Sequence, residues 1–313
     1  MHFLNDIARF FGLTGLLELL RSGQIDFRSL AGAEAMIVAI FPALLLVEIA
    51  FICIIYRAER GRLAAAFKIP AVVYILNTSV GLLIDLDVFV PTRRFAESHA
   101  LFIAPVSPAW FVYAYLVWEF SHFVYHWSAH RVRLLWCLHS PHHAPTHMNL
   151  SVIHVSFLLQ GAYATFVRVG ICTLLGVPLE LLVLAMAVDS CWGSLIHVSE
   201  EAWRSGRLPG FLGWVFLSPV HHRVHHASNP EYIDKNYCNT LPVWDRLFGT
   251  YQEPLEGVPV RYGITRPVQP GSFTDLYFGE FRALCHDMRR APDLRHALLL
   301  LVMPPEWGVS PRP

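Results

Sequence analysis

The sequence predicts an all-α fold: a polytopic transmembrane bundle of about four to five membrane helices with a histidine-rich cap on the cytosolic side. Three observations lead to this prediction. Of the 313 residues, 54% are hydrophobic and only 15% are charged, whereas soluble proteins carry about 25% charged residues. Apolar stretches of about 20 residues, long enough to cross a bilayer, recur along the chain. Thirteen of the seventeen histidines fall between His122 and His226.

Composition excludes several classes of protein. The formal net charge is zero, so nothing suggests a nucleic-acid partner. The six cysteines are scattered with no C-x-x-C pair, which indicates neither a disulfide framework nor a cysteine zinc site. The chain contains no G-x-S-x-G, P-loop or dinucleotide-binding motif. We therefore expect any electron source to be external.

The N-terminal third divides into two predicted parts. Residues 1–30 read as an interfacial segment, either a helix lying in the membrane surface or a packed amphipathic helix, and not as a signal peptide. Residues 31–114 read as the N-terminal transmembrane helices, with candidate spans at 35–56, 69–88 and 100–120. Pro42 and Glu48 fall inside the first candidate. An intramembrane carboxylate suggests function, although Glu48 is equally compatible with facing a helix partner or the interface.

The predicted catalytic domain covers 115–255, and 256–313 form a C-terminal tail. The apolar stretch at 100–120 runs without a break into His126. Residues 151–175 and 178–197 read as an apolar helical hairpin, split at Gly176-Val177-Pro178. In the tail, 295–303 is apolar but too short to span.

Arginine placement predicts the orientation. The arginine-rich stretch at 57–62 marks a cytosolic loop, and two further crossings return the chain to that side at Arg131 and Arg133. The 151–197 hairpin then goes out and back, so every histidine cluster faces the cytosol. Arg168 lies about 26 Å into a helix starting near 151, at about 1.5 Å per residue, which places it near the far interface.

The histidine clusters have metal-ligand spacing. His126 and His130 are four residues apart, so they share a helix face with His122 and with Glu119. The pattern H-x-x-H-H occurs twice, and we expect the two histidines three residues apart to converge on one ion while the adjacent third reaches another. With a lone histidine, the clusters supply nine or ten nitrogens, which suits two ions. Imidazole accepts Zn, Cu, Fe and Ni, so spacing leaves the metal open. The predicted ligands are His126, His130, His139, His142, His143, His197, His221, His222, His225 and His226.

Other residues near the clusters have supporting roles in this interpretation. His221 stays open as a ligand because His222 already completes the repeated spacing, and His147 and His154 are open between ligand, supporting and substrate-facing roles. Asp245 either supports the ligands, pairs with Arg246 or caps a turn. The supporting candidates are Glu119, His122, Asn149, Asp234, Asn236 and Asp245. The candidate pocket walls, for which plain packing is the alternative, are Phe123, Tyr125, Trp127, Trp136, Phe157 and Trp192.

Taken together, the motifs resemble the fatty acid hydroxylase / sterol desaturase superfamily of membrane di-iron oxygenases. That family's pattern runs D-F, H-x-x-x-H, H-x-x-H-H and H-x-x-H-H. It appears here as Glu119-Phe120, His126/His130, His139/His142/His143 and His222/His225/His226. The stretch 221–251 is similar to the alkylglycerol monooxygenase-like branch. The resemblance covers roughly 115–255.

The resemblance implies a helical membrane fold that holds two iron ions, with His197 as the family's isolated histidine ligand. It also implies activation of O2 and oxidation, most readily hydroxylation, of an unactivated C–H bond in a lipid. The reductant is external, a pterin in that branch or otherwise a redox protein. The sequence departs from the pattern at Trp127, where arginine is usual, at Glu119, where aspartate is usual, and at the unexpected His147 and His154.

Four other functions fit parts of the pattern. A lipid or sterol desaturase would use the same site. A non-catalytic metal-binding membrane scaffold would keep the fold, but the complete ligand pattern argues against decay. A metal transporter would bury its ligands at mid-membrane, whereas these clusters lie at helix ends. A zinc hydrolase needs fewer ligands and a positioned general base.

Overall fold

The structure is a computed structural model that describes residues 60–77, 80, 82–269 and 271–308, together with Ala50 and Ile54. Within this part of the chain all regular structure is helical, and a single isolated antiparallel bridge joins Ala227 to Tyr262. The predicted all-α class is therefore confirmed. The predicted interfacial segment 1–30, and the span 35–56 with Pro42 and Glu48, lie outside the described residues apart from Ala50 and Ile54.

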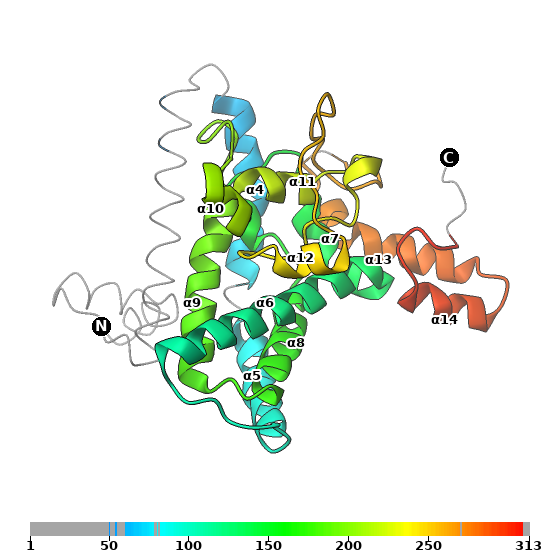
Figure 1. Cartoon of the computed structure of the whole chain (residues 1–313). Coiled ribbons are helices and arrows are strands. Elements are labelled where there is room, and N and C mark those ends of the chain that lie inside the picture. Colours follow the sequence, from blue (N-terminus) through cyan, green and yellow to red (C-terminus); the bar gives the residue numbers. More distant parts are fainter. Residues whose placement is uncertain are drawn as a thin grey trace, which may run out of the picture.

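The helices form a body of long elements and a cap of short ones (Figure 1). The long helices are α4 (Arg60–Leu76), α5 (Leu82–Glu97), α6 (Pro108–Arg131), α8 (Gln160–Leu174) and α9 (Leu179–Ile196). The cap contains α7 (Arg133–His143), η3 (Leu150–His154), α10 (Gly210–Val215), α11 (Pro219–His225), η4 (Pro230–Tyr232) and α12 (Val243–Phe248). The C-terminal pair α13 (Phe273–Arg289) and α14 (Leu294–Val302) extends to one side.

Helix α6 connects the body to the cap. It begins where the Ser107 side chain accepts a hydrogen bond from the Trp110 amide and Pro108 fits the first turn. It then runs 24 residues to Arg131, so the apolar stretch and the first histidine pair share one helix, as predicted. The predicted start at residue 100 is wrong, because the chain from 100 to 107 is not helical. Val132 is extended, which ends α6 and starts α7 in a new direction.

The predicted hairpin of α8 and α9 is confirmed. Gly176 adopts a left-handed φ of 78° and Pro178 is extended, so the chain reverses between the helices. Helix α8 starts at Gln160 rather than near 151, because Asn149 caps the short helix η3 at 150–154. The predicted place of Arg168 is therefore wrong: it lies eight residues after Gln160, about 12 Å into α8, and not at the far end.

The core of the body joins α6, α8 and α9. Ala114 and Trp118 from α6, Cys172 from α8, and Leu182 and Ala185 from α9 pack in one buried cluster. Burial of such apolar side chains stabilises the fold by about 25 cal/mol per Å² removed from water. Helices α6 and α9 also contact the cap, α6 through α7 and α12 and α9 through α11 and η3. This core therefore supports the cap.

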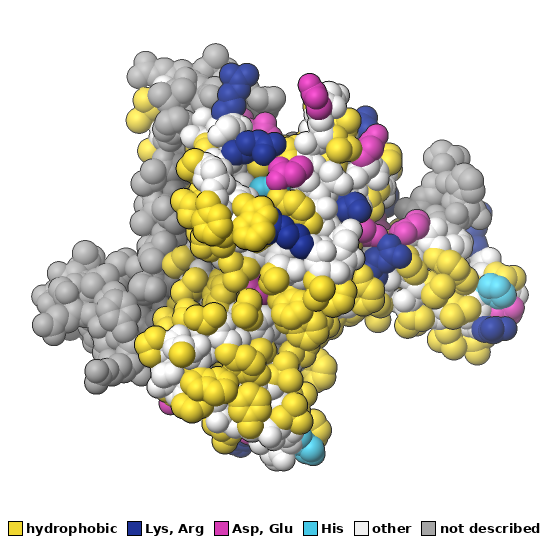
Figure 2. All heavy atoms as spheres, viewed as in Figure 1, with side chains coloured by type: hydrophobic (Ala, Val, Ile, Leu, Met, Phe, Trp, Pro, Cys, Tyr) yellow, Lys and Arg dark blue, Asp and Glu magenta, His cyan; other side chains and the backbone are white. Residues whose placement is uncertain are grey.

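Among the described residues, one helix, α9, is long and apolar enough to cross a membrane. The predicted span 69–88 is divided between α4 and α5, so the predicted number of spans stays a prediction. Figure 2 shows that hydrophobic side chains cover the end of the molecule away from the cap, while charged side chains gather on and beside the cap. Exposed apolar residues of the body include Val112, Phe166 and Leu184.

We predict that Gly176→Ala destabilises the protein. A Cβ atom there would lie 2.5 Å from the Phe102 carbonyl oxygen, and the backbone φ of 78° is strained for alanine, at a cost of about 1–3 kcal/mol. Thermal unfolding in detergent should show a lower midpoint. The control is Gly170→Ala, whose Cβ meets only Thr92 Cγ2 at 3.6 Å and which should not lower the midpoint. Equal midpoints for wild type and Gly176→Ala would contradict this account of the turn.

Candidate metal centre

Nine buried histidines form two adjacent groups, and the candidate ligand atoms of each group lie within 4.8 Å of one another. The first histidine group is His126, His130, His139, His143 and His225. The second histidine group is His142, His197, His222 and His226. The groups are in contact, since the His143 ring stacks on the His226 ring at a centroid distance of 4.4 Å.

The spacing of the ring nitrogens matches a ligand set. In the first group, His139 Nε2 lies 3.0 Å from His126 Nε2 and 3.2 Å from His143 Nε2. In the second group, His222 Nε2 lies 2.9 Å from His197 Nε2 and 3.0 Å from His226 Nε2. Nitrogens bound about 2.0–2.1 Å from one ion stand roughly 3.0–3.4 Å apart. The rings are therefore placed as ligands of a shared ion are placed.

Each H-x-x-H-H motif divides its histidines between the groups, but not as its spacing was interpreted. On α7, His139 and His143 join the first group and His142 joins the second. On α11, His222 and His226 share the second group and His225 joins the first. The residues four apart converge, not those three apart. Each residue of an α-helix is rotated by about 100° from the one before it. Side chains four residues apart therefore differ in direction by about 40°, and side chains three residues apart by about 60° in the opposite sense.

In four of these rings, Nδ1, the nitrogen that points away from the centre of the group, is hydrogen-bonded to a backbone carbonyl. Nδ1 of His126 lies 2.7 Å from the Tyr237 oxygen, and Nδ1 of His225 lies 2.8 Å from the Lys235 oxygen. In the second group, His142 Nδ1 faces the Val152 oxygen of η3, which Asn149 caps, and His197 Nδ1 faces the Gly193 oxygen of α9. A carbonyl accepts the Nδ1 proton, which leaves the Nε2 lone pair toward the centre of the group.

Residues 234–240, which we call the supporting segment, carry two of these acceptors and a carboxylate near a third ring. Lys235 and Tyr237 supply carbonyls to His225 and His126, and an Asp234 oxygen lies 3.7 Å from His130 Nδ1. Asp234 also pairs with Arg131. Burial acts to raise the pKa of Asp234, but His130 and Arg131 lower it to about 2, so this carboxylate is charged at neutral pH.

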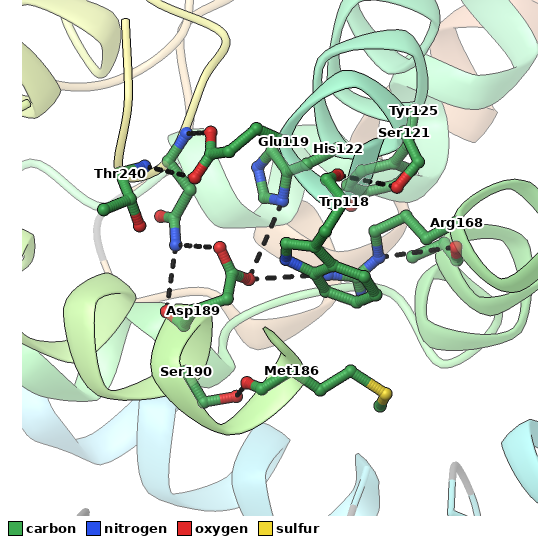
Figure 3. Close-up of polar contacts among 12 residues, drawn as sticks. Trp118, Glu119, Ser121, His122, Tyr125, Arg168, Met186, Asp189, Ser190 and Thr240 are labelled. Atoms are coloured by element: carbon green, nitrogen blue, oxygen red, sulfur yellow. Dashed lines mark hydrogen bonds and ion pairs between the residues drawn. The ribbon is translucent and has the colours of Figure 1, made fainter. Parts of the chain in front are cut away.

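Two buried carboxylates fix the supporting segment. Asp245 accepts hydrogen bonds from the amides of Tyr237 and Cys238, both at 2.8 Å. Glu119 accepts from the amides of Asn239 and Thr240, at 3.3 and 2.9 Å (Figure 3). Four successive N–H groups are thus bound. Neither hydrogen-bonded set includes a histidine ring, so both carboxylates act on the histidines through the backbone. Asp245 also accepts a hydrogen bond from the Thr250 hydroxyl, so it holds the turn at 245–250 as well as the supporting segment.

The supporting segment needs an unusual backbone. Asp234 and Asn236 have positive φ values of 61° and 56°, the two such non-glycine residues in the described chain. Asn236 is held by hydrogen bonds from its side chain to the His221 and Gln252 carbonyls and from the Gln252 amide. Strained conformations of this kind persist where the surroundings enforce them, which agrees with a role in positioning the rings.

The electrostatic environment keeps the imidazoles neutral. Burial, and next the proximity of the other histidines, lowers the pKa of His139, His143 and His225 well below the usual value near 6.5. Neutral imidazole is the form that binds metal ions. The groups can therefore accept cations at neutral pH without first releasing protons.

The remaining predicted histidines lie outside the two groups. His221 is buried, but its Nδ1 caps α11 at Ser218 and its Nε2 faces Glu253 and Tyr251 at 2.9 and 3.0 Å. Both of its nitrogens are therefore engaged elsewhere. His122 and His154 line a cavity beside the groups, and His147 lies 3.7 Å from Glu201.

Two cavities reach the groups. The first cavity, of about 310 Å³, touches both groups through His126, His139, His142, His197 and His222. Its other walls come from α6, α8, α9, the chain around η3 and Asn239 of the supporting segment. The second cavity, of about 680 Å³, touches the first group through His130, His143 and His225, and its other walls include residues 263–266 and Glu280 of α13.

Two of the six predicted aromatic walls line these cavities: Tyr125 the first and Trp136 the second. Of the other four, Phe123 stacks on Phe248, and Phe157 and Trp192 contact Tyr277 and Phe216 with tilted rings, so packing explains these three better. Trp127 is exposed and lines neither cavity. The sequence interpretation missed Asp189 and misplaced Arg168, both in the first cavity. An aspartate inside the apolar stretch 178–197 is a signal that could have revealed the former.

Comparison with known proteins identifies the domain. The model of the fatty acid hydroxylase family matches residues 111–250. These residues are a fatty acid hydroxylase domain. The chain is 29% identical over 213 residues to human alkylglycerol monooxygenase, a match that covers 68% of this chain and 46% of the relative.

Two other relatives agree with this assignment. Alkylglycerol monooxygenase of Danio rerio is 31% identical over 56% of this chain and 37% of its own. Ornithine lipid hydroxylase of Rhizobium tropici is 30% identical over 50% of this chain and 46% of its own. The matches thus span less than half the length of these relatives. No solved structure matches the chain at a significant level.

We predict that His221→Ala leaves the metal content of the purified protein unchanged, whereas His222→Ala lowers it. The reason is that His222 Nε2 faces the second group while both nitrogens of His221 have other partners. Elemental analysis of iron-supplemented preparations measures the difference. Loss of metal in His221→Ala comparable to that in His222→Ala would overturn the division between these neighbours.

We also predict that Glu119→Gln and Asp245→Asn weaken metal binding by about 10-fold or more, the range seen when groups behind the ligands are removed. Each change places an NH2 group against backbone N–H donors and releases the supporting segment. A chelator competition assay measures the affinity. Asp293→Asn is the matched control, since Asp293 accepts from the His296 amide on the surface of α14. Unchanged affinity in both carboxylate variants would show that the segment is held by other contacts.

Proposed function

We propose that this protein is a membrane-bound lipid monooxygenase in which the two histidine groups hold two iron ions that use O2 to hydroxylate a lipid C–H bond. The observation that carries the proposal is the pair of adjacent groups of buried, neutral imidazoles that share one cavity. The relatives supply the reaction type, since they are named as a monooxygenase and a lipid hydroxylase.

The residues fit a pair of metal ions. Nε2 of His130 and of His225 is buried without a hydrogen-bond partner in the described chain, which is costly unless an ion takes the lone pair. Imidazole donors suit iron, copper and zinc alike; the named activities of the relatives favour iron. The first histidine group would hold one ion and the second the other. Bound iron supplies the electrons that activate O2 for C–H oxidation.

The chain's own part in the reaction is to place the lipid and to exclude water. The first cavity is bounded by α6, α8 and the apolar helix α9, so we assign it to the substrate, which would enter from the lipid phase. Its walls touch histidines of both groups. A lipid bound there would therefore have a C–H bond beside both ions. A confined site of this kind also protects reactive species from side reactions.

We assign the second cavity to the electron donor. It reaches the first group from the cap, through His130, His143 and His225, and so leaves the first cavity free for the lipid. Trp136 offers an aromatic face, and Arg266 and Glu280 offer charged groups. A pterin or a redox protein docking over this opening fits the assignment. We place the cap, and hence the donor site, on the cytosolic side of a multi-pass protein, as the arginine placement predicts. The hydrophobic side chains that cover the end of the molecule away from the cap in Figure 2 support a membrane-embedded body.

The test is metal analysis followed by a reaction under labelled O2. We predict about two irons per chain and incorporation of one labelled oxygen atom into an alkylglycerol or an ornithine lipid, detected by mass spectrometry. The double variant His142→Ala/His225→Ala should lose both metal and activity. His286→Ala, on the exposed part of α13, is the control and should lose neither.

Each alternative gives a different result in this experiment. Loss of two hydrogens without oxygen incorporation identifies a desaturase. Iron bound without any product from a panel of lipids supports a non-catalytic scaffold. Absence of bound metal in both the wild type and the double variant contradicts the proposal.

A further inference from the structure

A buried charged pair stands in the first cavity beside the histidine groups. Arg168 of α8 and Asp189 of α9 both line the cavity, with His122 of α6 and Asn239 of the supporting segment. Asp189 is 6% exposed and lies well inside the apolar helix α9. Charged residues are expensive in such surroundings and generally have a function. The metal groups do not require this pair, because neither residue belongs to them.

The two charged groups of the pair are not in direct hydrogen-bond contact with each other. Asp189 Oδ1 accepts a hydrogen bond from Asn239 Nδ2 at 2.6 Å. Its other oxygen, Oδ2, lies 3.9 Å from an Arg168 amino nitrogen and 4.0 Å from His122 Nδ1. Figure 3 shows the carboxylate facing both side chains. These distances exceed a hydrogen bond, and such a gap suggests that another polar atom lies between the groups.

Arg168 has unused hydrogen-bonding capacity. In the described chain its guanidinium makes one long hydrogen bond, from Nε to the Ala164 carbonyl at 3.4 Å, besides the loose contact with Asp189. A guanidinium offers five N–H donors. Its plane is held over the Trp118 ring at 4.8 Å and the Tyr125 ring at 5.5 Å, so it is fixed in position while its donors remain free for a ligand.

The donors and acceptors on either side of the gap between Arg168 and Asp189 determine which chemical group fits there. Arg168 donates and Asp189 accepts, and their charges cancel, so the pair favours an uncharged group that both accepts and donates. A hydroxyl group does this. An oxygen about 2.8 Å from each side of a gap of this width makes an angle of about 90°, which a hydroxyl or a water molecule tolerates.

We infer that Arg168 and Asp189, with His122 beside them, bind a hydroxyl group of the lipid substrate and thereby position the lipid under the histidine groups. This inference rests on the proposed function for the identity of the ligand as a lipid. The His122 ring lies 5.4 Å from the ring of His126, a member of the first group. A lipid anchored at this pair therefore presents the carbons nearest its hydroxyl group to the metal centre. Arg168, Asp189 and His122 are positioning residues, not ligands.

The experiment compares two probe lipids, a long-chain 1-O-alkylglycerol and its 2,3-di-O-methyl ether, which can accept but not donate. Equilibrium binding to the purified metal-loaded protein is measured without O2, so that no turnover occurs. We expect the wild type to bind the free diol at least about 10-fold more tightly, the scale of one charge-assisted hydrogen bond. In Asp189→Asn the preference should fall close to one, because the charged acceptor is lost. In Arg168→Gln both lipids should bind more weakly, because both accept from Arg168.

Matched controls keep the test decisive. Arg295→Gln removes an exposed arginine of α14 and should retain the full preference. Metal content and helical circular dichroism verify that each variant is folded, and Arg168→Lys is the substitute if Arg168→Gln is not. The inference is overturned if the wild type shows no preference, if Asp189→Asn retains it, or if Arg168→Gln leaves the affinity for both lipids unchanged; any of these would assign the gap to water alone.

The outcome separates this inference from the proposed function. A preference that depends on Asp189 and an affinity that depends on Arg168, but without oxidation when O2 is admitted, would sustain the binding site and contradict the monooxygenase. Oxidation of both lipids with equal binding would sustain the monooxygenase and contradict the binding site.

Discussion

The structure depends on one constraint: nine neutral imidazoles have to be buried with their lone pairs converging on two points. A buried ring that could rotate or exchange its tautomer would lose the shared geometry, and a fixed acceptor for its Nδ1 proton prevents both. The acceptors for His126, His142, His197 and His225 are backbone carbonyls. Irregular parts of the cap, η3 and the supporting segment 234–240, place three of these carbonyls, and Gly193 of α9 supplies the fourth.

The two carboxylates that bind the supporting segment show that residues far from the histidine rings help to position them. Glu119 and Asp245 lie on different helices, α6 and α12, yet they bind four successive amides of one segment. The segment in turn places Tyr237, whose carbonyl holds His126 on α6. Asn239 continues the same connection to Asp189 on α9. The first histidine group and the first cavity are thus connected by one short stretch of chain that belongs to neither the body nor a helix of the cap.

The sequence predicted the helical class, the continuous helix α6 and the turn at Gly176, because apolar periodicity, glycine and proline act locally. It also predicted which histidines come together, apart from His221. It predicted the wrong pairing within each H-x-x-H-H motif, because the sharing of ligands between α7 and α11 depends on how the helices face each other. The role of Glu119 through backbone amides could not be read from its spacing to His122, and the late start of α8, which moves Arg168 into the cavity, depends on the capped turn at Asn149.

The central claim is that two histidine groups in contact hold two metal ions as one centre. Mössbauer spectroscopy of the protein loaded with iron-57 tests this claim most directly, because it counts distinct iron sites and detects magnetic coupling between them. The account predicts two iron sites per chain in nitrogen-rich surroundings, coupled to each other in the oxidised protein. A single site, or two sites without coupling, would contradict a shared centre.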